Sequence, residues 1–174
     1  QREYKWEEKQ VHELVDDLAG RFQEDHVDSN PREAVDGYGH YFLGSIIISH
    51  RDGRNFVIDG QQRLTSLTLL LIYLHNLQRE SKSPVKIDDL IYSEKFAKKS
   101  FNIDVDERAS VMEALFEGKQ PGISGESESV QYIAARYEDI VEHFPDELKD
   151  EALPYFLDWL IEHVYLVEIT AHSD

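Results

Sequence analysis

Residues 56–67 read FVIDGQQRLTSL, and this stretch decides the fold because it joins a strand directly to a long helix. The apolar run 56–58 predicts a buried strand, and Gly60 allows a sharp turn after it. A helix is then predicted from residue 62 to about residue 80. It is apolar on nearly every side, which predicts burial as the central helix. A strand that turns directly into a helix presents free backbone N–H groups and the positive end of a helix dipole, where anions bind in many unrelated folds.

The first turn of this helix has two interpretations. In a capping box, Asp59 caps the helix and Gln62, three residues later, reaches back to the Asp59 backbone N–H. A cap needs no ligand, but it does not explain Arg63. The charge of Arg63 opposes the helix dipole at a cost of about 0.3–1 kcal/mol. A bound anion removes that cost, because the planar guanidinium suits phosphate oxygens. The same turn carries two hydroxyl side chains, Thr65 and Ser66. The segment therefore predicts a phosphate-binding site.

The composition indicates a globular and strongly acidic protein. The 41% of hydrophobic residues, with 8 Phe, 9 Tyr and 2 Trp, predicts a folded protein. Its 174 residues can bury one hydrophobic core, or form one domain and part of a second. The 35 acidic residues against 18 Lys and Arg give a net charge of −17. A surface this acidic does not hold a DNA backbone by itself, since that affinity comes largely from phosphate neutralisation. Either a basic DNA-contacting part lies outside this sequence, or the protein comes from a high-salt organism.

Several classes of site are excluded. The absence of Cys excludes disulfides, thiolate zinc sites and thiol catalysis, and it fits a reducing, cytoplasmic location. No apolar run approaches the roughly 20 residues of a membrane span, and we expect no signal peptide, because the sequence opens with charged residues. Neither an HExxH motif nor a GxSxG motif is present, and the eight His lack metal-binding spacing. Gly39 and Gly44 have P-loop spacing, but Ser45 and Ile46 replace its Lys and Ser/Thr.

Strands and helices alternate along the rest of the chain. Residues 41–49 predict a strand that a turn at Asp52 and Gly53 connects to the strand 56–58 as a hairpin. Gly44 interrupts this strand, which often marks the close approach of a ligand or backbone. Residues 164–170 predict a strand whose partner is either the hairpin or a segment outside the sequence. Helices are predicted at 7–23, 107–117, 128–143 and 147–162, the last one bent or broken at Pro154. Loops are predicted at 25–39, 95–100 and 118–129. Residues 87–92 predict a short strand or turn, and residues 101–104 a strand or loop.

The first six residues are dense in groups that recognise nucleotides. Gln1 supplies an amide and Arg2 a guanidinium, while Tyr4 and Trp6 supply aromatic faces. The alternative is that the two aromatic rings simply pack on the core.

Three stretches together resemble the GmrS-like domain of the GmrSD type IV restriction enzymes. They are, in order, Gln1-Arg2-x-Tyr4-x-Trp6, residues 41–46 (YFLGSI) and residues 58–67 (IDGQQRLTSL). Later stretches at 101–104, 127–137 and 164–170 fit more loosely, so that the resemblance spans essentially the whole chain. The DGQQR core in its strand-to-helix setting is its most specific part.

The resemblance implies an α+β fold of the ParB/sulfiredoxin type, with a small mixed sheet and a long buried central helix, followed by a mainly helical region. Residues 1–80 would form the nucleotide-binding core. Residues 81–174 would form the helical region with its C-terminal strand, truncated before the end of the domain. Such domains bind and hydrolyse nucleoside triphosphates, and an HNH-type nuclease domain that cuts foreign modified DNA usually follows. Nuclease activity is not expected in this piece. The resemblance allows either a monomer or an oligomer.

The resemblance also implies roles for individual residues. Asp59 would hold Mg²⁺ or orient the attacking water, Gln61 and Gln62 would position the water or phosphate oxygens, and Arg63 would stabilise charge on the transferring phosphoryl group. Arg2 would be a second phosphate contact. The remaining candidate residues for nucleotide binding are Gln1, Tyr4, Trp6, Tyr41, Gly44, Ser45, Gly60, Thr65 and Ser66.

Three functions compete at this stage. The first is an NTP-hydrolysing domain of a modification-dependent nuclease. The second is a nucleotide-switched sensor that uses the same site without meaningful turnover. The third is an interaction or DNA-reading module in which the DGQQR segment is only a helix cap.

Overall fold

The computed structural model describes residues 3–95, 98–101 and 106–171. It contains both helices and strands, and the predicted α+β class is confirmed. The elements are α1 (Glu8–Asp25), the 3₁₀ helix η1 (Arg32–Gly37), β1 (Tyr41–Arg51), β2 (Arg54–Asp59), α2 (Gln61–Leu77), α3 (Asp88–Ile91), β3 (Tyr92–Lys95), β4 (Lys98–Phe101), α4 (Asp106–Phe116), α5 (Glu128–His143), the 3₁₀ helix η2 (Asp146–Leu148), α6 (Leu153–His163) and β5 (Val164–Ala171).

The chain forms two compact units whose segments alternate along the sequence. The first unit consists of residues 1–2, 16–61 and 145–174, and the second consists of residues 3–15 and 62–144. One boundary divides α1 between Val15 and Asp16, and another falls between Gln61 and Gln62, inside the DGQQR motif. The division into regions 1–80 and 81–174 stays a prediction.

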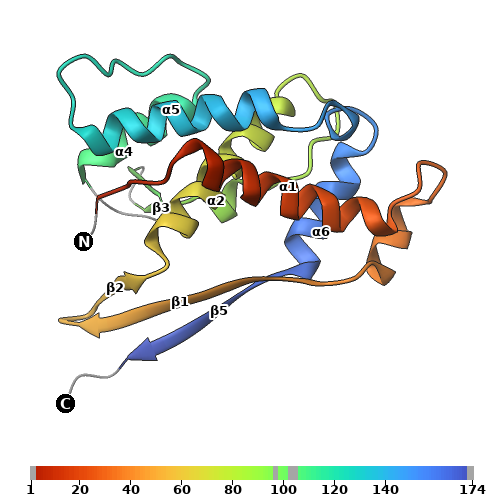
Figure 1. Cartoon of the computed structure of the whole chain (residues 1–174), viewed down its shortest axis with the longest axis horizontal. Coiled ribbons are helices and arrows are strands. Elements are labelled where there is room, and N and C mark those ends of the chain that lie inside the picture. The colour runs from red at the N-terminus through yellow and green to blue at the C-terminus, as the bar shows by residue number, and fades with distance from the viewer. Residues whose placement is uncertain (1–2, 96–97, 102–105, 172–174) are drawn as a thin grey trace. The chain divides into compact units, whose positions relative to one another are not determined.

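The first unit contains a three-stranded mixed sheet in the order β2-β1-β5. β1 and β2 pair antiparallel through a turn in which Asp52 has a φ of 51° and Gly53 a φ of 73°, so the predicted hairpin is confirmed. β5 runs parallel to β1 along its other edge (Figure 1). Of the two partners open to the C-terminal strand, the hairpin is the one it takes. The register of this pairing shifts between Phe42 and Gly44, where Gly44 has a φ of 135°.

An aromatic cluster forms the core of the first unit. Phe22 of α1 is fully buried, and its ring centroid lies 4.7 Å from that of His26 and 5.3 Å from that of Phe156 in α6. Trp159 of α6 donates from Nε1 to the Gly39 carbonyl at 2.9 Å. These contacts hold α6 against the core. Because β5 follows α6 directly in the sequence, they also help to place β5 beside β1.

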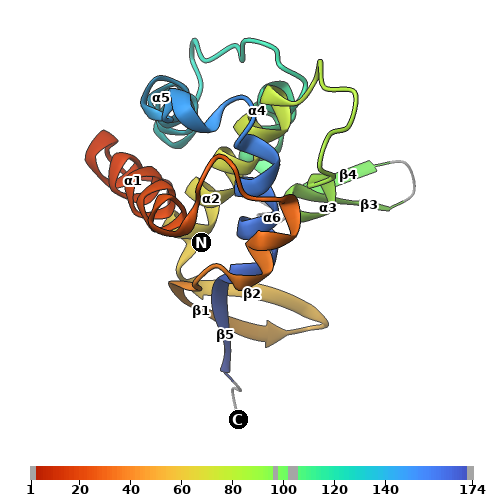
Figure 2. The ribbon, with the colours of Figure 1, turned by 90° about the vertical axis from the view of Figure 1, so that its right-hand side faces the viewer.

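The second unit is organised around α2, whose side chains are buried at Thr65, at Ser66 and from Thr68 to Leu74. This confirms the predicted buried helix. Asn76 near the end of α2 donates to the Leu115 carbonyl of α4 at 2.9 Å and to the Tyr137 hydroxyl of α5 at 2.8 Å. α4 and α5 also pack against each other, and a short β3–β4 hairpin extends beside α3 (Figure 2).

Several local predictions are corrected. In the basic stretch 95–100, expected as a solvated loop, Lys95 belongs to β3 and residues 98–100 belong to β4, and Lys95 pairs with Lys98. Residues 87–92, expected as a short strand or turn, contain the short helix α3. The segment 25–39 contains η1, and the helix expected at 147–162 begins only at Leu153, because Pro154 lies in its first turn. Residues 102–104 lie outside the described residues. Within the described ranges, no helix combines the length and apolarity that crossing a membrane requires.

Candidate functional site

The DGQQR motif occupies the predicted strand-to-helix turn. β2 ends at Asp59, Gly60 alone separates the two elements, and α2 begins at Gln61 (Figure 1). Gly60 has a φ of 88°, which residues other than glycine rarely adopt. A Cβ atom at residue 60 would lie 2.7 Å from Ile46 Cγ2 and 3.1 Å from the Ser45 carbonyl oxygen. Gly60 is therefore required by its close approach to β1.

The part of the motif in the first unit comprises Asp59, Gly60 and Gln61. The Asp59 side chain is exposed, while its backbone pairs with Ile47 of β1. Gln61 donates from Nε2 to the Val57 carbonyl of β2 at 2.6 Å. This bond ties the first residue of α2 back to the strand that precedes it and leaves the Asp59 carboxylate at the surface.

The part of the motif in the second unit begins with Gln62, whose amide binds the N-terminal segment. Its Oε1 accepts from the Lys5 backbone N–H at 2.8 Å, and its Nε2 donates to the Glu3 carbonyl at 2.7 Å. The amide thus has different partners from those of the capping box that the sequence allowed. We call this pair of hydrogen bonds the amide clamp.

Tyr4 lies inside the clamped segment and is only 1% exposed. Its hydroxyl hydrogen-bonds with Ser66 Oγ at 2.8 Å, and its backbone N–H donates to Ser129 Oγ at 2.9 Å. Burial raises the pKa of the Tyr4 hydroxyl well above its ordinary value, against the opposing effect of the Ser66 hydrogen bond. Tyr4 is therefore a neutral core residue, as the packing alternative proposed, and its ring has no exposed face for a base.

Trp6, at the end of the same segment, is half-buried. Its carbonyl oxygen accepts from Arg136 Nη1 at 3.1 Å. Arg136 also binds Asp139 through Nε at 2.7 Å, so that its charge is neutralised. Trp6 stays a predicted stacking residue.

Arg63 differs from the paired arginines of the chain. Its side chain is half-buried, the first turn of α2 contains no acidic residue, and no described residue forms a hydrogen bond or ion pair with its guanidinium. By contrast, Arg21 binds Glu24 and Asp25 at 2.8 and 3.2 Å. In the turn of Arg63 the Thr65 Oγ1 is buried and has no hydrogen-bond partner among the described residues. The guanidinium and the helix dipole thus favour an anion at this turn.

The remaining predicted residues are distributed as follows. Gln1 and Arg2 lie outside the described residues. The Ser45 carbonyl oxygen lies 3.1 Å from the place that a Cβ atom at residue 60 would occupy, and Tyr41 lies at the start of β1. Ser66 donates to the Gln62 carbonyl at 2.8 Å in addition to its bond with Tyr4. Reasoning from sequence missed Ser129, which holds the Tyr4 backbone, because nothing in the pattern links two residues so far apart.

The expected Mg²⁺ has one plausible ligand in Asp59, because an exposed carboxylate can share the ion with substrate phosphates and water. Among the described residues, no group of three or more His, Asp or Glu side chains is arranged to hold a metal ion. Asp59 as a metal ligand stays a prediction.

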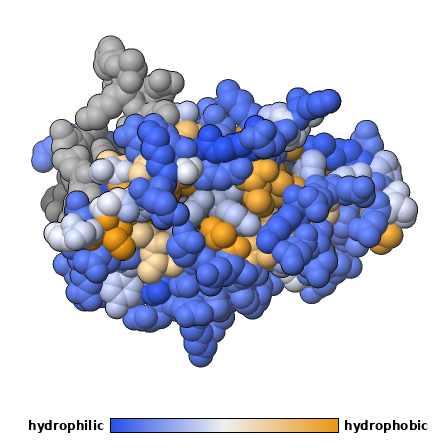
Figure 3. Space-filling model, turned by 90° about the horizontal axis from the view of Figure 1, so that it is seen from above, coloured by the Kyte–Doolittle hydropathy of each residue, from blue (hydrophilic) through white to orange (hydrophobic). Residues whose placement is uncertain are grey.

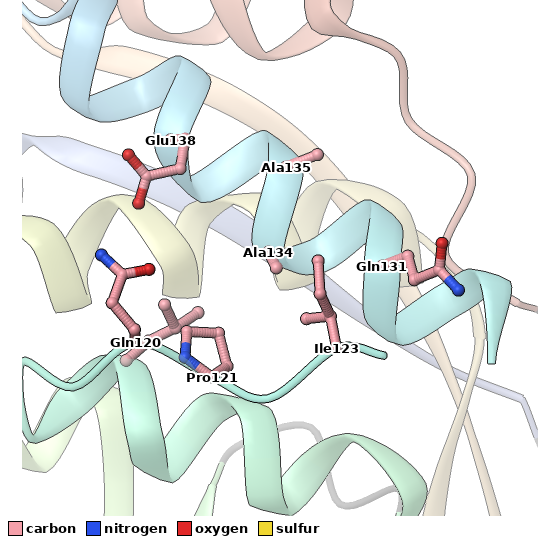
Figure 4. Close-up of a pocket in the computed structure, with 8 residues that line it drawn as sticks. Gln120, Pro121, Ile123, Gln131, Ala134, Ala135 and Glu138 are labelled. Atoms are coloured by element: carbon pink, nitrogen blue, oxygen red, sulfur yellow. The ribbon is translucent and has the colours of Figure 1, made fainter. Parts of the chain in front are cut away.

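A cavity of about 170 Å³ lies between α5 and the loop after α4 (Figure 4). Its lining is Leu115, Gln120, Pro121, Ile123, Gln131, Ala134, Ala135 and Glu138, none of which is a predicted site residue. Ligand pockets usually enclose about 300–1,000 Å³. The cavity is therefore too small for a whole nucleotide.

Similarity to known proteins extends over the whole chain. No curated protein matches it at a significant level. The model of the family described as GmrSD restriction endonuclease, N-terminal domain, matches residues 1–174. The resemblance inferred from the three motifs is thus confirmed, and the chain belongs to the GmrSD restriction endonuclease N-terminal domain family.

Proposed function

We propose that this domain binds and hydrolyses nucleoside triphosphates, and that it serves a restriction endonuclease directed against foreign modified DNA. The observation that carries the proposal is the Arg63 guanidinium. It lies in the first turn of a buried helix that follows a strand after a single glycine, and no described residue neutralises it. A triphosphate tail supplies the anion that this turn favours.

Two residues of the motif, Arg63 and Asp59, and the nearby Thr65 take roles in this proposal. Arg63 binds the phosphoryl oxygens and stabilises the charge that develops on them during transfer. Asp59 holds Mg²⁺ or orients the attacking water. When bound, Mg²⁺ would neutralise part of the phosphate charge. Thr65 donates its buried hydroxyl to the same anion.

The link to DNA rests on the family and on the resemblance to modification-dependent enzymes. The net charge of −17 makes this domain a poor partner for a DNA backbone. Hydrophilic residues cover most of the face in Figure 3, and apolar residues occur there in small separate groups. We therefore assign DNA contact and cleavage to other parts of the full-length protein, such as an HNH-type nuclease domain, and nucleotide binding to the present ParB/sulfiredoxin-like domain.

The test combines nucleotide binding with phosphate release. The wild-type domain should be stabilised against heat by an NTP with Mg²⁺ and should release phosphate. Arg63→Ala should weaken binding about tenfold or more, a loss of at least about 1.4 kcal/mol. Asp59→Ala should abolish phosphate release while the fold remains intact by circular dichroism. Lys9→Ala is the matched control, because Lys9 is an 86% exposed cation outside the site. A melting temperature that no NTP changes would contradict the proposal.

A nucleotide-switched sensor is the second candidate, and one observation favours it. The amides of Gln61 and Gln62 both bind main-chain atoms, which leaves fewer groups to orient a water molecule. Tight nucleotide binding with phosphate release no faster than the uncatalysed reaction would select the sensor over the hydrolase.

A further inference from the structure

We propose that Gln62 is a positioning residue that acts through the N-terminal segment, and that the amide clamp sets the nucleotide affinity of the domain. The inference rests on the proposed function, since it assigns Gln62 an indirect role at the same site. This role takes the place of the predicted direct contact between the Gln62 amide and a phosphate or water. Both ends of that amide are already hydrogen-bonded, at 2.8 and 2.7 Å.

The chemistry of the clamp requires a carboxamide. In an extended segment, the carbonyl of one residue and the N–H two residues later point to the same side. The Gln62 side chain meets this pair at Glu3 and Lys5 with one acceptor and one donor, as a neighbouring strand would. A carboxylate has acceptors only and an ammonium has donors only, so neither could make both bonds.

The clamp acts separately from the other contacts of the segment. Tyr4 is fixed by Ser66 and by Ser129, and the Trp6 carbonyl is bound by Arg136. Removing the Gln62 amide therefore frees the backbone at residues 3 and 5, while the Tyr4 ring keeps its own hydrogen bonds. The expected effect is local loosening of the segment.

The clamp reaches nucleotide binding through its neighbours in sequence. Arg63 follows Gln62 directly, and Trp6, a predicted nucleotide contact, follows the clamped residues 3–5. A segment that is free before binding must be ordered when the nucleotide binds, and this ordering reduces affinity. Loss of the clamp should thus weaken binding without removing any group that touches the ligand.

The experiment breaks the same hydrogen bond from either side. Gln62→Ala removes the amide, whereas Lys5→Pro removes the N–H and leaves Gln62 intact. Lys5→Ala controls for loss of the lysine side chain. Affinity is measured calorimetrically with a non-hydrolysable NTP and Mg²⁺, and backbone loosening by hydrogen exchange of the Lys5 and Tyr4 amides without nucleotide.

We expect Gln62→Ala and Lys5→Pro each to lower affinity about tenfold, and the double variant to be no weaker than either. Lys5→Ala, which keeps the Lys5 N–H, should change affinity less than about twofold. In Gln62→Ala the Lys5 amide should lose protection from exchange while the Tyr4 amide keeps it.

Three results would overturn the inference. Faster exchange at Lys5 with unchanged affinity would make the clamp purely structural. A loss of affinity in Gln62→Ala, with Lys5 still protected and Lys5→Pro no weaker than Lys5→Ala, would show that Gln62 touches the ligand. Absence of nucleotide binding in the wild-type domain would refute the proposed function and this role together, and the exchange data would still report on the clamp itself.

Discussion

At the scale of single residues, Gly60 has little freedom to change. We expect Gly60→Ala to destabilise the domain by about 2 kcal/mol or more, because it combines a φ of 88° with a Cβ atom 2.7 Å from Ile46 Cγ2. Chemical denaturation of the purified variant measures the change.

Two other glycines provide matched controls for that measurement. Gly53 has a φ of 73° but open space around it, so Gly53→Ala should cost only about 1 kcal/mol. Gly20 lies inside α1 with nothing within 4 Å, so Gly20→Ala should stabilise the domain by about 0.5–1 kcal/mol. Equal losses at Gly60 and Gly53 would show that close packing against β1 is unimportant.

His26 makes stability depend on pH. Burial lowers its pKa below 6.5, and nearby Asp28 only partly opposes this. Since the folded state then binds fewer protons than the unfolded state, the contribution is present above about pH 6.5 and is lost as the pH falls. We expect the melting temperature of the wild type to fall more than that of His26→Gln when the pH is lowered from about 7.5 to 5.5. Identical slopes for both proteins would contradict this assignment.

Residue types alone predicted part of the candidate site. The cost of a cation in the first turn identified Arg63, and the structure leaves that guanidinium without a described partner. Gln62 was harder, because a capping box and the amide clamp require the same residue in the same place. Only the return of residues 3–5 to α2 distinguishes them, and that contact spans 57 residues in the hydrogen bond from Lys5.

At the scale of elements, local chemistry predicted boundaries best where a cap was present. α5 runs from Glu128 to His143 as expected, since Ser127 caps it by accepting from the Val130 N–H. The β3–β4 hairpin was missed because its paired lysines read as a solvated loop. Strand pairing depends on tertiary context, which short polar sequences do not reveal.

Asn76 joins three helices of the second unit, and its removal tests that connection. Asn76→Ala should lower the free energy of unfolding by about 2 kcal/mol, because the Leu115 carbonyl and Tyr137 hydroxyl each lose a hydrogen bond. Gln131→Ala, which removes one exposed amide bond to the Glu126 carbonyl, should cost less than about 0.5 kcal/mol. Similar losses in urea denaturation of both variants would argue against a special role for Asn76.

At the scale of the whole molecule, the charge of −17 governs encounters with DNA. We expect this domain not to retard duplex DNA in a gel at any ionic strength. Lower salt should strengthen the repulsion, whereas it strengthens the binding of ordinary DNA-binding proteins. Retardation that increases as salt is removed would reveal a basic surface that the net charge conceals.

The parallel pairing of β1 with β5 has a consequence for synthesis on the ribosome. Tyr41 pairs with Val164, so the sheet remains incomplete until nearly the whole domain has been translated. All residues of the second unit emerge earlier, since that unit ends at Phe144. We therefore expect a nascent chain in which residue 144, but not yet β5, has left the ribosomal exit tunnel to protect the second unit from proteases, while β1 and β2 still await the strand that completes their sheet.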